Sequence, residues 1–138
     1  MIYSKLIDDL IEFNLNHREK YQGHKLCCSP VAYAMEFCTI RCDVGRQVGK
    51  TKYIKDRAGD GDLVIVANEN MKHLFMNDMC GHPMVMTPRD IHHGPSNDIR
   101  FSRIFIDEPR MVFKHISQDE LYTILCHGGE QTFILLGR

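Results

Sequence analysis

The sequence lacks an excess of charge of either sign. Its 17 Lys and Arg side chains face 18 Asp and Glu, which gives the 138 residues a net charge of −1. Nucleic-acid binding through bulk charge is therefore not indicated, because a basic face would have to be offset elsewhere. No apolar run reaches the roughly 18 residues of a membrane span, and acids interrupt the N-terminal stretch MIYSKLIDDLIEF, unlike a secretory signal. We expect a cytoplasmic protein with no membrane partner.

The sequence also lacks a C-x-x-C pair, although it contains six cysteines. Without such a pair or a secretion signal, we expect free thiols in a reducing compartment. Cys38 and Cys126 lie in apolar surroundings and are predicted to be small core residues. Four aromatic residues are likewise predicted to belong to the core and not to a stacking platform: Phe101, Phe105, Phe113 and Tyr122.

What the sequence does contain is an alternation of strand-like and helix-like segments within the length of one domain. Hydrophobic periodicity and capping residues predict helices at 3–20, 30–35, 50–57, 69–79 and 117–128, and strands at 37–44, 63–68, 103–109 and 132–138. The segment 83–86 is a small strand at best, and 87–100 is predicted to be a loop. Alternation of this kind predicts an α/β fold with a mainly parallel sheet covered by helices.

The segment CDVGRQVGKTKYI, residues 42–54, ends a predicted strand and begins a predicted helix. Its Gly-Lys-Thr is the ending of a phosphate-binding loop, G-x-x-x-x-G-K-[ST], but Val44 stands where the first glycine is usual. Gly49 would let the backbone approach phosphates, Lys50 would reach the β- and γ-phosphates, and the Thr51 hydroxyl would bind Mg²⁺. The tripeptide alone is weak evidence for a nucleotide site.

A second motif supports the first. Residues 104–108 read Ile-Phe-Ile-Asp-Glu, an apolar strand that ends in two adjacent acids. Asp107 would hold Mg²⁺ through water beside the loop, and Glu108 would orient or deprotonate the attacking water. A buried strand running into a solvated turn is the simpler interpretation of this motif alone. Both motifs in this order, with another strand between them, predict a nucleotide site.

Together, GRQVGKT and IFIDE resemble the ATPase domain of the large terminase subunits that package DNA into viral heads. More broadly they are similar to P-loop ATPases with a catalytic glutamate. The terminase loop commonly lacks the first glycine and reads small residue–Arg–Gln–x–Gly–Lys–Thr, which corresponds here to Gly45, Arg46, Gln47, Val48, Gly49, Lys50 and Thr51. The resemblance implies a three-layer P-loop fold, ATP and Mg²⁺ as cofactors, and Arg46 as an arginine finger acting in cis. It places the acidic pair on Asp107 and Glu108.

The resemblance covers residues 37–138, which it identifies as a minimal ATPase core, and leaves residues 1–36 as a helical segment packed on that core. Terminases are several times longer and carry a nuclease domain that has no counterpart here. Their coupling motif ends a strand with Ser or Thr, whereas the strand here ends FILLGR. The resemblance implies a viral protein of the host cytoplasm that acts on DNA or a DNA-processing protein, with the oligomeric state left open.

ATP is favoured over GTP because no Asn/Thr-Lys-x-Asp base-reading motif follows the acidic strand. A nucleoside kinase is a rival within the same fold. Such a kinase would usually have an arginine-rich lid after this strand, where only Arg110 and Arg138 remain. From a different functional class, a non-catalytic interaction protein that keeps the nucleotide-binding fold and regulates another protein is the alternative to an ATPase.

Two further groups of residues have simple interpretations. Cys80, His82, His92 and His93 could bind zinc, but their spacing matches no common zinc module, and we interpret the histidines as solvated or hydrogen-bonded. Lys52, Lys55 and Arg57 follow the loop and are interpreted as a solvated helix face, with DNA contact as the alternative.

Overall fold

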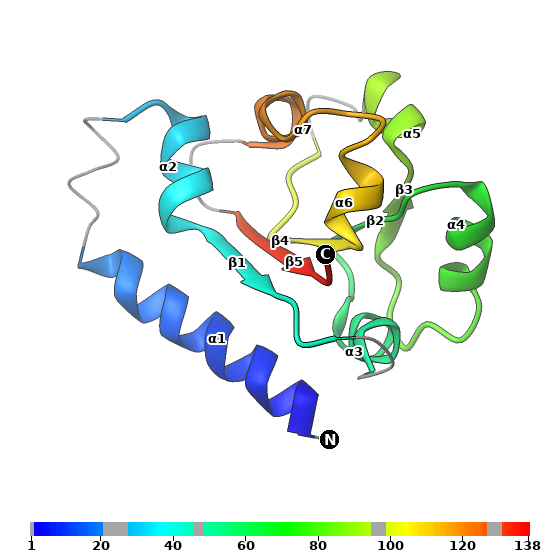
Figure 1. The fold of residues 1–138 in the computed structure, drawn as a ribbon, viewed down its shortest axis with the longest axis horizontal. Coiled ribbons are helices and arrows are strands. Elements are labelled where there is room, and N and C mark those ends of the chain that lie inside the picture. Colours follow the sequence, from blue (N-terminus) through cyan, green and yellow to red (C-terminus); the bar gives the residue numbers. More distant parts are fainter. Residues whose placement is uncertain (1, 21–27, 46–48, 95–98, 127–130) are drawn as a thin grey trace.

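The structure is a computed structural model that describes residues 2–20, 28–45, 49–94, 99–126 and 131–138. Its single sheet has five strands in the order β1-β5-β4-β2-β3, and every neighbouring pair is parallel (Figure 1). The elements are α1 (Ile2–Glu19), α2 (Pro30–Phe37), β1 (Thr39–Cys42), α3 (Lys50–Arg57), β2 (Leu63–Ile65), α4 (Glu69–Met76), β3 (Met84–Met86), α5 (Pro88–His92), β4 (Arg103–Asp107), α6 (Pro109–Val112), α7 (Gln118–Leu125) and β5 (Thr132–Leu136). The predicted α/β class with a parallel sheet is confirmed.

Helices cover both faces of the sheet, which is compatible with a three-layer α/β fold (Figure 1). Successive strand residues alternate between two core clusters: in β4, Ile104 and Ile106 pack with α2, α5, α6 and α7, while Phe105 packs with α1, α3 and α4. A parallel strand buried on both faces reads as a continuous apolar run, which is why 63–66 and 132–136 contain almost no polar residue. Phe101, Phe105 and Tyr122 are buried in this core as predicted, and Phe113 is partly buried against it.

Two segments are more regular than the sequence predicted. The prediction of a loop over 87–100 was wrong at its start, because α5 forms there: Thr87 and Asp90 make a reciprocal capping box, and Pro88 occupies the first turn. The short segment Met84–Met86 is a full member of the sheet, since it pairs with β2 in register. Earlier in the chain, α2 continues to Phe37, and β1 therefore begins two residues later than the predicted strand.

Helix α1 lies along the edge strand β1 and contacts α3 (Figure 1). Its inner face contributes Tyr3 and Ile7 to the core shared with α3, and the Asn14 side chain donates a hydrogen bond to the Phe37 carbonyl oxygen at 2.9 Å. Among the described residues, no helix combines the length and the apolar character that crossing a membrane requires. The thiols of Cys28, Cys42 and Cys80 are free.

Candidate functional site at the carboxyl edge of the sheet

All five strands end at the same edge of the sheet because all are parallel. Ligands of open α/β sheets bind outside this carboxyl edge. Strand β5 lies between β1 and β4, so the loop after β1 and the acids after β4 are two strand spacings apart, roughly 10 Å. The two predicted motifs, distant in sequence, therefore lie at the same edge and within reach of long side chains.

The Gly-Lys-Thr sequence forms the beginning of α3. Gly49 is the N-terminal cap and has φ 95°, a left-handed conformation that glycine adopts without strain. Lys50 is the first helical residue, and its side chain is only 11% exposed. Thr51 is exposed in the first turn. Free N–H groups and the helix dipole make such a terminus favourable for an anion.

Of the start of the predicted phosphate loop, the structure describes Gly45. Gly45 has φ 106°, and its N–H donates to Asp43 Oδ1 at 3.4 Å, so the chain turns directly after β1. Arg46, Gln47 and Val48 lie outside the described residues. Their predicted roles, including that of Arg46 as an arginine finger, remain predictions.

The acids at the end of β4 occupy two different environments. Asp107 is the last residue of the strand and is 4% exposed. Glu108 follows in a left-handed conformation, φ 51° and ψ 70°, and caps the short helix α6. A non-glycine residue in this region costs on the order of 1–3 kcal/mol, and such strain is concentrated at functional sites. The conformation turns Glu108 away from the strand direction.

The two motifs meet in one contact. Lys50 Nζ lies 2.5 Å from Glu108 Oε1, across 58 positions of sequence. The sequence predicts that both residues belong to a phosphate site, with Lys50 directed at phosphates and Glu108 at water. In the structure they form an ion pair with each other, and the Lys50 end of this pair is nearly buried. The ammonium group is therefore compensated by Glu108 and held at the carboxyl edge.

Gly137 is a component of the site that sequence reasoning missed. It follows β5, the strand between the two motifs, and a Cβ there would lie 2.9 Å from the Cδ and both carboxylate oxygens of Glu108. The Glu108 carboxylate thus lies directly over Gly137. The Gly137 N–H donates to the Cys42 carbonyl oxygen, and the Glu108 N–H donates to that of Leu136. The signal for Gly137 in the sequence was its position directly after an apolar strand, at the end of which the family that the sequence resembles has Ser or Thr.

The electrostatics of Asp107 differ from those of an ordinary surface carboxylate. Burial, with the charge of Glu108 as a second cause, raises the pKa of Asp107 to about 6, and the charge of Lys50 opposes this rise. No donor among the described residues makes a hydrogen bond to its carboxylate. A buried carboxylate with no donor is stabilised by a cation, so Asp107 fits the predicted role of a Mg²⁺ ligand.

Thr51, the second ligand predicted for Mg²⁺, lies at the same carboxyl edge of the sheet as Asp107. Across the described part of the chain, no group of three or more His, Cys, Asp or Glu side chains is arranged to hold a metal ion. The predicted zinc alternative gains no support. Cys80 Sγ is 3.7 Å from Asp56 Oδ1, whereas His92 Nε2 is 3.2 Å from the His115 carbonyl oxygen.

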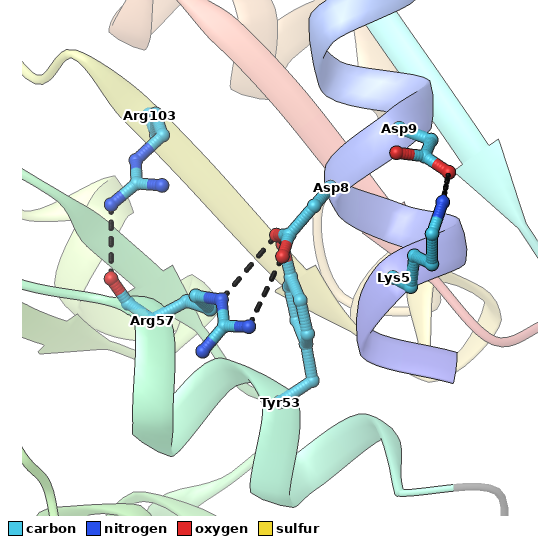
Figure 2. A network of polar contacts seen from close by, with 6 residues as sticks. All are labelled: Lys5, Asp8, Asp9, Tyr53, Arg57 and Arg103. Carbon is cyan, nitrogen blue, oxygen red and sulfur yellow. Dashed lines mark hydrogen bonds and ion pairs between the residues drawn. The ribbon is translucent and has the colours of Figure 1, made fainter. Parts of the chain in front are cut away.

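Helix α3 is anchored at its other end by α1 (Figure 2). The Tyr53 hydroxyl donates to Asp8 Oδ1 at 2.7 Å, and the Arg57 guanidinium binds both oxygens of Asp8 at 3.3 and 3.1 Å. Arg103 Nη2 donates to the Arg57 carbonyl oxygen at 2.9 Å. Lys52 is 3.2 Å from Asp56. Two of the three cations interpreted as a solvated helix face are therefore ion-paired, and the network fixes the helix whose first residue is Lys50.

No protein-family model matches the chain, and no curated protein matches its sequence.

Proposed function

We propose that the protein is a P-loop ATPase that binds ATP with Mg²⁺ and hydrolyses it. The observation that carries the proposal is the ion pair between Lys50 and Glu108. It joins the Gly-Lys-Thr motif at the start of a helix to the acidic end of a buried strand, at the edge where α/β sheets bind ligands. Neither motif would support the proposal alone, because each recurs by chance in unrelated proteins.

The phosphates of ATP would lie against the beginning of α3. The N–H groups of this first turn and the left-handed Gly49 provide a favourable environment for an anion. Lys50 would then leave Glu108 and contact the β- and γ-phosphates. Residues 45–48 would complete the loop, with Arg46 stabilising the charge that develops on the γ-phosphate.

Exchange of partners by Lys50 gives Glu108 its role. In the structure, the ammonium group occupies Glu108 Oε1. Once Lys50 binds phosphate, this oxygen is available to accept a proton from a water molecule that attacks the γ-phosphate. Gly137 leaves the space in which the Glu108 carboxylate is positioned. The ion pair is thus the resting arrangement of a site that ATP would open.

Asp107 and Thr51 would hold Mg²⁺ at this site. When bound, Mg²⁺ supplies charge neutralisation for the phosphate oxygens. Asp107 brings a carboxylate that is buried and has no donor among the described residues, which suits it to a cation. Thr51 brings an exposed hydroxyl from the first turn of α3.

By resemblance to terminases and related motors, the substrate system would be DNA or a DNA-processing protein of a virus, in the cytoplasm of its host. The alternative is a nucleotide-binding fold that has no turnover and regulates a partner by docking. The structure offers one observation in favour of this alternative, because Lys50 is already neutralised by Glu108. The two functions predict different results for a single variant.

That variant is Glu108→Gln, which keeps the size of the side chain but cannot accept a proton. Release of phosphate from Mg·ATP, with and without double-stranded DNA, should fall about 10²- to 10⁴-fold. ATP affinity should stay level or rise, because a negative charge near the γ-phosphate is removed. Glu36→Gln, at an exposed position on α2, is the matched control and should leave turnover unchanged.

Arg46→Ala should also slow turnover, by roughly 10³-fold, with little loss of ATP binding. If the unmodified protein binds ATP but shows no turnover above the Glu108→Gln background, with or without DNA, the ATPase proposal is wrong. The nucleotide-binding interaction protein would then be the better description.

A further inference from the structure

A cavity of about 420 Å³ opens at the same carboxyl edge of the sheet. It lies on the side of Glu108 that is opposite to Lys50, because β2 and β3 follow β4 in the strand order. It is formed where β2 and β3 end: Ala67 and Asn68 follow β2, and Pro88 and Arg89 begin α5 after β3. Ile65 of β2 pairs with Ile106 of β4. Ala67 and Glu108, each two residues further, therefore follow the ends of adjacent strands. The cavity has a size typical of small-molecule pockets, about 300–1,000 Å³.

Polar contacts join the helices and the loop segment that surround this cavity. Lys72 of α4 makes an ion pair with Asp90 of α5 at 3.0 Å. His92 Nε2 is 3.2 Å from the His115 carbonyl oxygen, to which it can donate, and His92 Nδ1 is 3.3 Å from Glu120 Oε1 on α7, an ion pair that forms when His92 is protonated. These contacts hold α4, α5, α7 and the segment after α6 around the opening. The cavity is therefore preorganised, which lowers the entropic cost of binding a ligand.

Three hydrogen-bond donors remain available at its lining. The Arg89 guanidinium and the His115 ring have no partner among the described residues, and both are exposed. Asn68 uses its side-chain oxygen to cap α4, which leaves its amide N–H groups to donate. Ala67 and Pro88 supply apolar surface between these donors. The lining thus offers donors and one uncompensated cation around an apolar floor.

One acid, Glu69, also lines the cavity. It stands in the first turn of α4, where the helix terminus stabilises a negative charge without any ligand. Arg89 stands in the last turn of the five-residue helix α5, where the helix terminus favours a cation only weakly at an exposed position, and it has no ion-pair partner within the described residues. The group that would satisfy Arg89, His115 and Asn68 together is an anion with several acceptor oxygens. Arginine binds carboxylate and phosphate alike, but a phosphate carries more acceptor oxygens than a carboxylate, which favours phosphate for donors that come from three separate elements.

We propose that this cavity binds a small organic phosphate, with Arg89 holding the phosphate group and the apolar floor holding the organic part. A cavity of this volume is much larger than a phosphate group, so the ligand carries an organic moiety. The site is separate from the one proposed for ATP, and its existence does not depend on that function. Its place beside Glu108 would put the ligand next to the nucleotide if both bind.

The test uses the Lys50→Ala protein, so that binding at the proposed ATP site is weakened. Ribose 5-phosphate and AMP are titrated by calorimetry and followed by backbone amide NMR, with ribose, D-ribonate and inorganic phosphate as comparison ligands. We expect binding of at least one organic phosphate, with shifts at Ala67, Arg89 and His115. Ribose and D-ribonate should bind more weakly.

Arg89→Gln should then weaken the organic phosphate by roughly 10- to 100-fold, the range for a charge-assisted contact. Arg110→Gln, an exposed arginine of α6 that does not line the cavity, is the matched control and should bind as tightly as its parent. The proposal is overturned if neither organic phosphate binds at millimolar concentration, or if Arg89→Gln binds as tightly as its parent. Equal binding of D-ribonate, or shifts confined to Thr51 and Glu108, would also overturn it.

Discussion

The two ends of helix α3 are built in opposite ways. Toward its C-terminal end, Arg57, together with Tyr53 from the middle of the helix, binds Asp8 of α1 (Figure 2). At its N-terminal end, Lys50 meets Glu108, which is held in a left-handed conformation next to the buried Asp107. The contacts at the C-terminal end pair opposite charges and stabilise the fold. The N-terminal end includes a left-handed non-glycine residue and a buried carboxylate, which both cost stability. Costs of this kind are expected where a protein retains groups for function.

The two aspartates express the same difference in their protonation. Hydrogen bonds from Arg57 lower the pKa of Asp8, despite some opposing desolvation. Burial raises the pKa of Asp107 to about 6. Folding therefore favours the charged form of Asp8 and the neutral form of Asp107. Near neutral pH, Asp8 contributes to stability while Asp107 opposes it, so only Asp107 requires a reason other than stability.

The largest effect that would sharpen this comparison is expected at Gly137. In Gly137→Ala, the new Cβ would lie 2.9 Å from the Glu108 carboxylate and would displace it. A misplacement of about 1 Å at a catalytic group can cost on the order of 10²-fold in rate, so ATP turnover should fall by about that factor. ATP binding should change little, because Lys50 is proposed to leave Glu108 when it binds phosphate, and the atoms nearest to the new Cβ belong to Glu108 and not to the beginning of α3.

Gly59→Ala is the matched control for this variant, since a Cβ at Gly59 has nothing within 4 Å. Gly137 has φ +101°, so Gly137→Ala also carries strain, roughly 1–2 kcal/mol. Thermal unfolding separates this loss of stability from the loss of rate. A folded Gly137→Ala protein with the turnover of Gly59→Ala would show that Gly137 does not position Glu108.

Asp107→Asn tests the buried carboxylate by its stability. A raised pKa means that the contribution of Asp107 to folding is fully present below pH 3.8 and is lost as the pH rises through about 6. Removing the charge should therefore stabilise the protein at pH 8, on the order of 1–3 kcal/mol, with little difference near pH 4. Denaturant unfolding at both pH values measures this. Equal stability of the two proteins at pH 8 would contradict the account.

Asp8→Asn should give a smaller effect of opposite sign. The stability that a lowered pKa provides is present above the ordinary pKa of Asp and is lost as the pH falls through the folded value. The amide oxygen of the variant could still accept from Tyr53, so only the charge that faces Arg57 is removed. Because Asp8 is partly exposed and screened by solvent, the loss at pH 8, measured by denaturant unfolding, should be about 1 kcal/mol or less. A gain in stability at pH 8 would remove the contrast between the two ends.

The sequence was sufficient to predict the sheet because its strands are continuous apolar runs, of which LVIV and TFILL are examples. It could not predict α5, since Pro88 and Gly94 read as loop residues until the capping box of Thr87 and Asp90 is seen in place. In a helix of only five residues, the capping signal is too short to outweigh a proline and a glycine in a prediction from sequence. The weak strand Met84–Met86 likewise gains its place from pairing with β2, a non-local interaction.

For the candidate site, local motifs identified Lys50, Asp107 and Glu108, but not how they are arranged. The ion pair between Lys50 and Glu108 depends on the strand order, in which β5 separates β1 from β4. Gly137 could be recognised only from this strand order, because it contributes no reactive group and matters only through the space that it leaves for the Glu108 carboxylate above β5. Sequence spacing carries no information on which strands become neighbours.

The most direct test of the account is calorimetric titration of Mg·ATP into the unmodified protein and into Lys50→Ala. Lys50 is the cation placed at the start of α3, and a charge-assisted contact of this kind is worth roughly 1.5–3 kcal/mol. We expect that the unmodified protein binds ATP and that Lys50→Ala binds it about 10- to 100-fold more weakly. Lys52→Ala, an exposed lysine on the same helix, should match the unmodified protein. Equal ATP affinity of the Lys50→Ala and unmodified proteins would contradict the assignment of this edge as a nucleotide site.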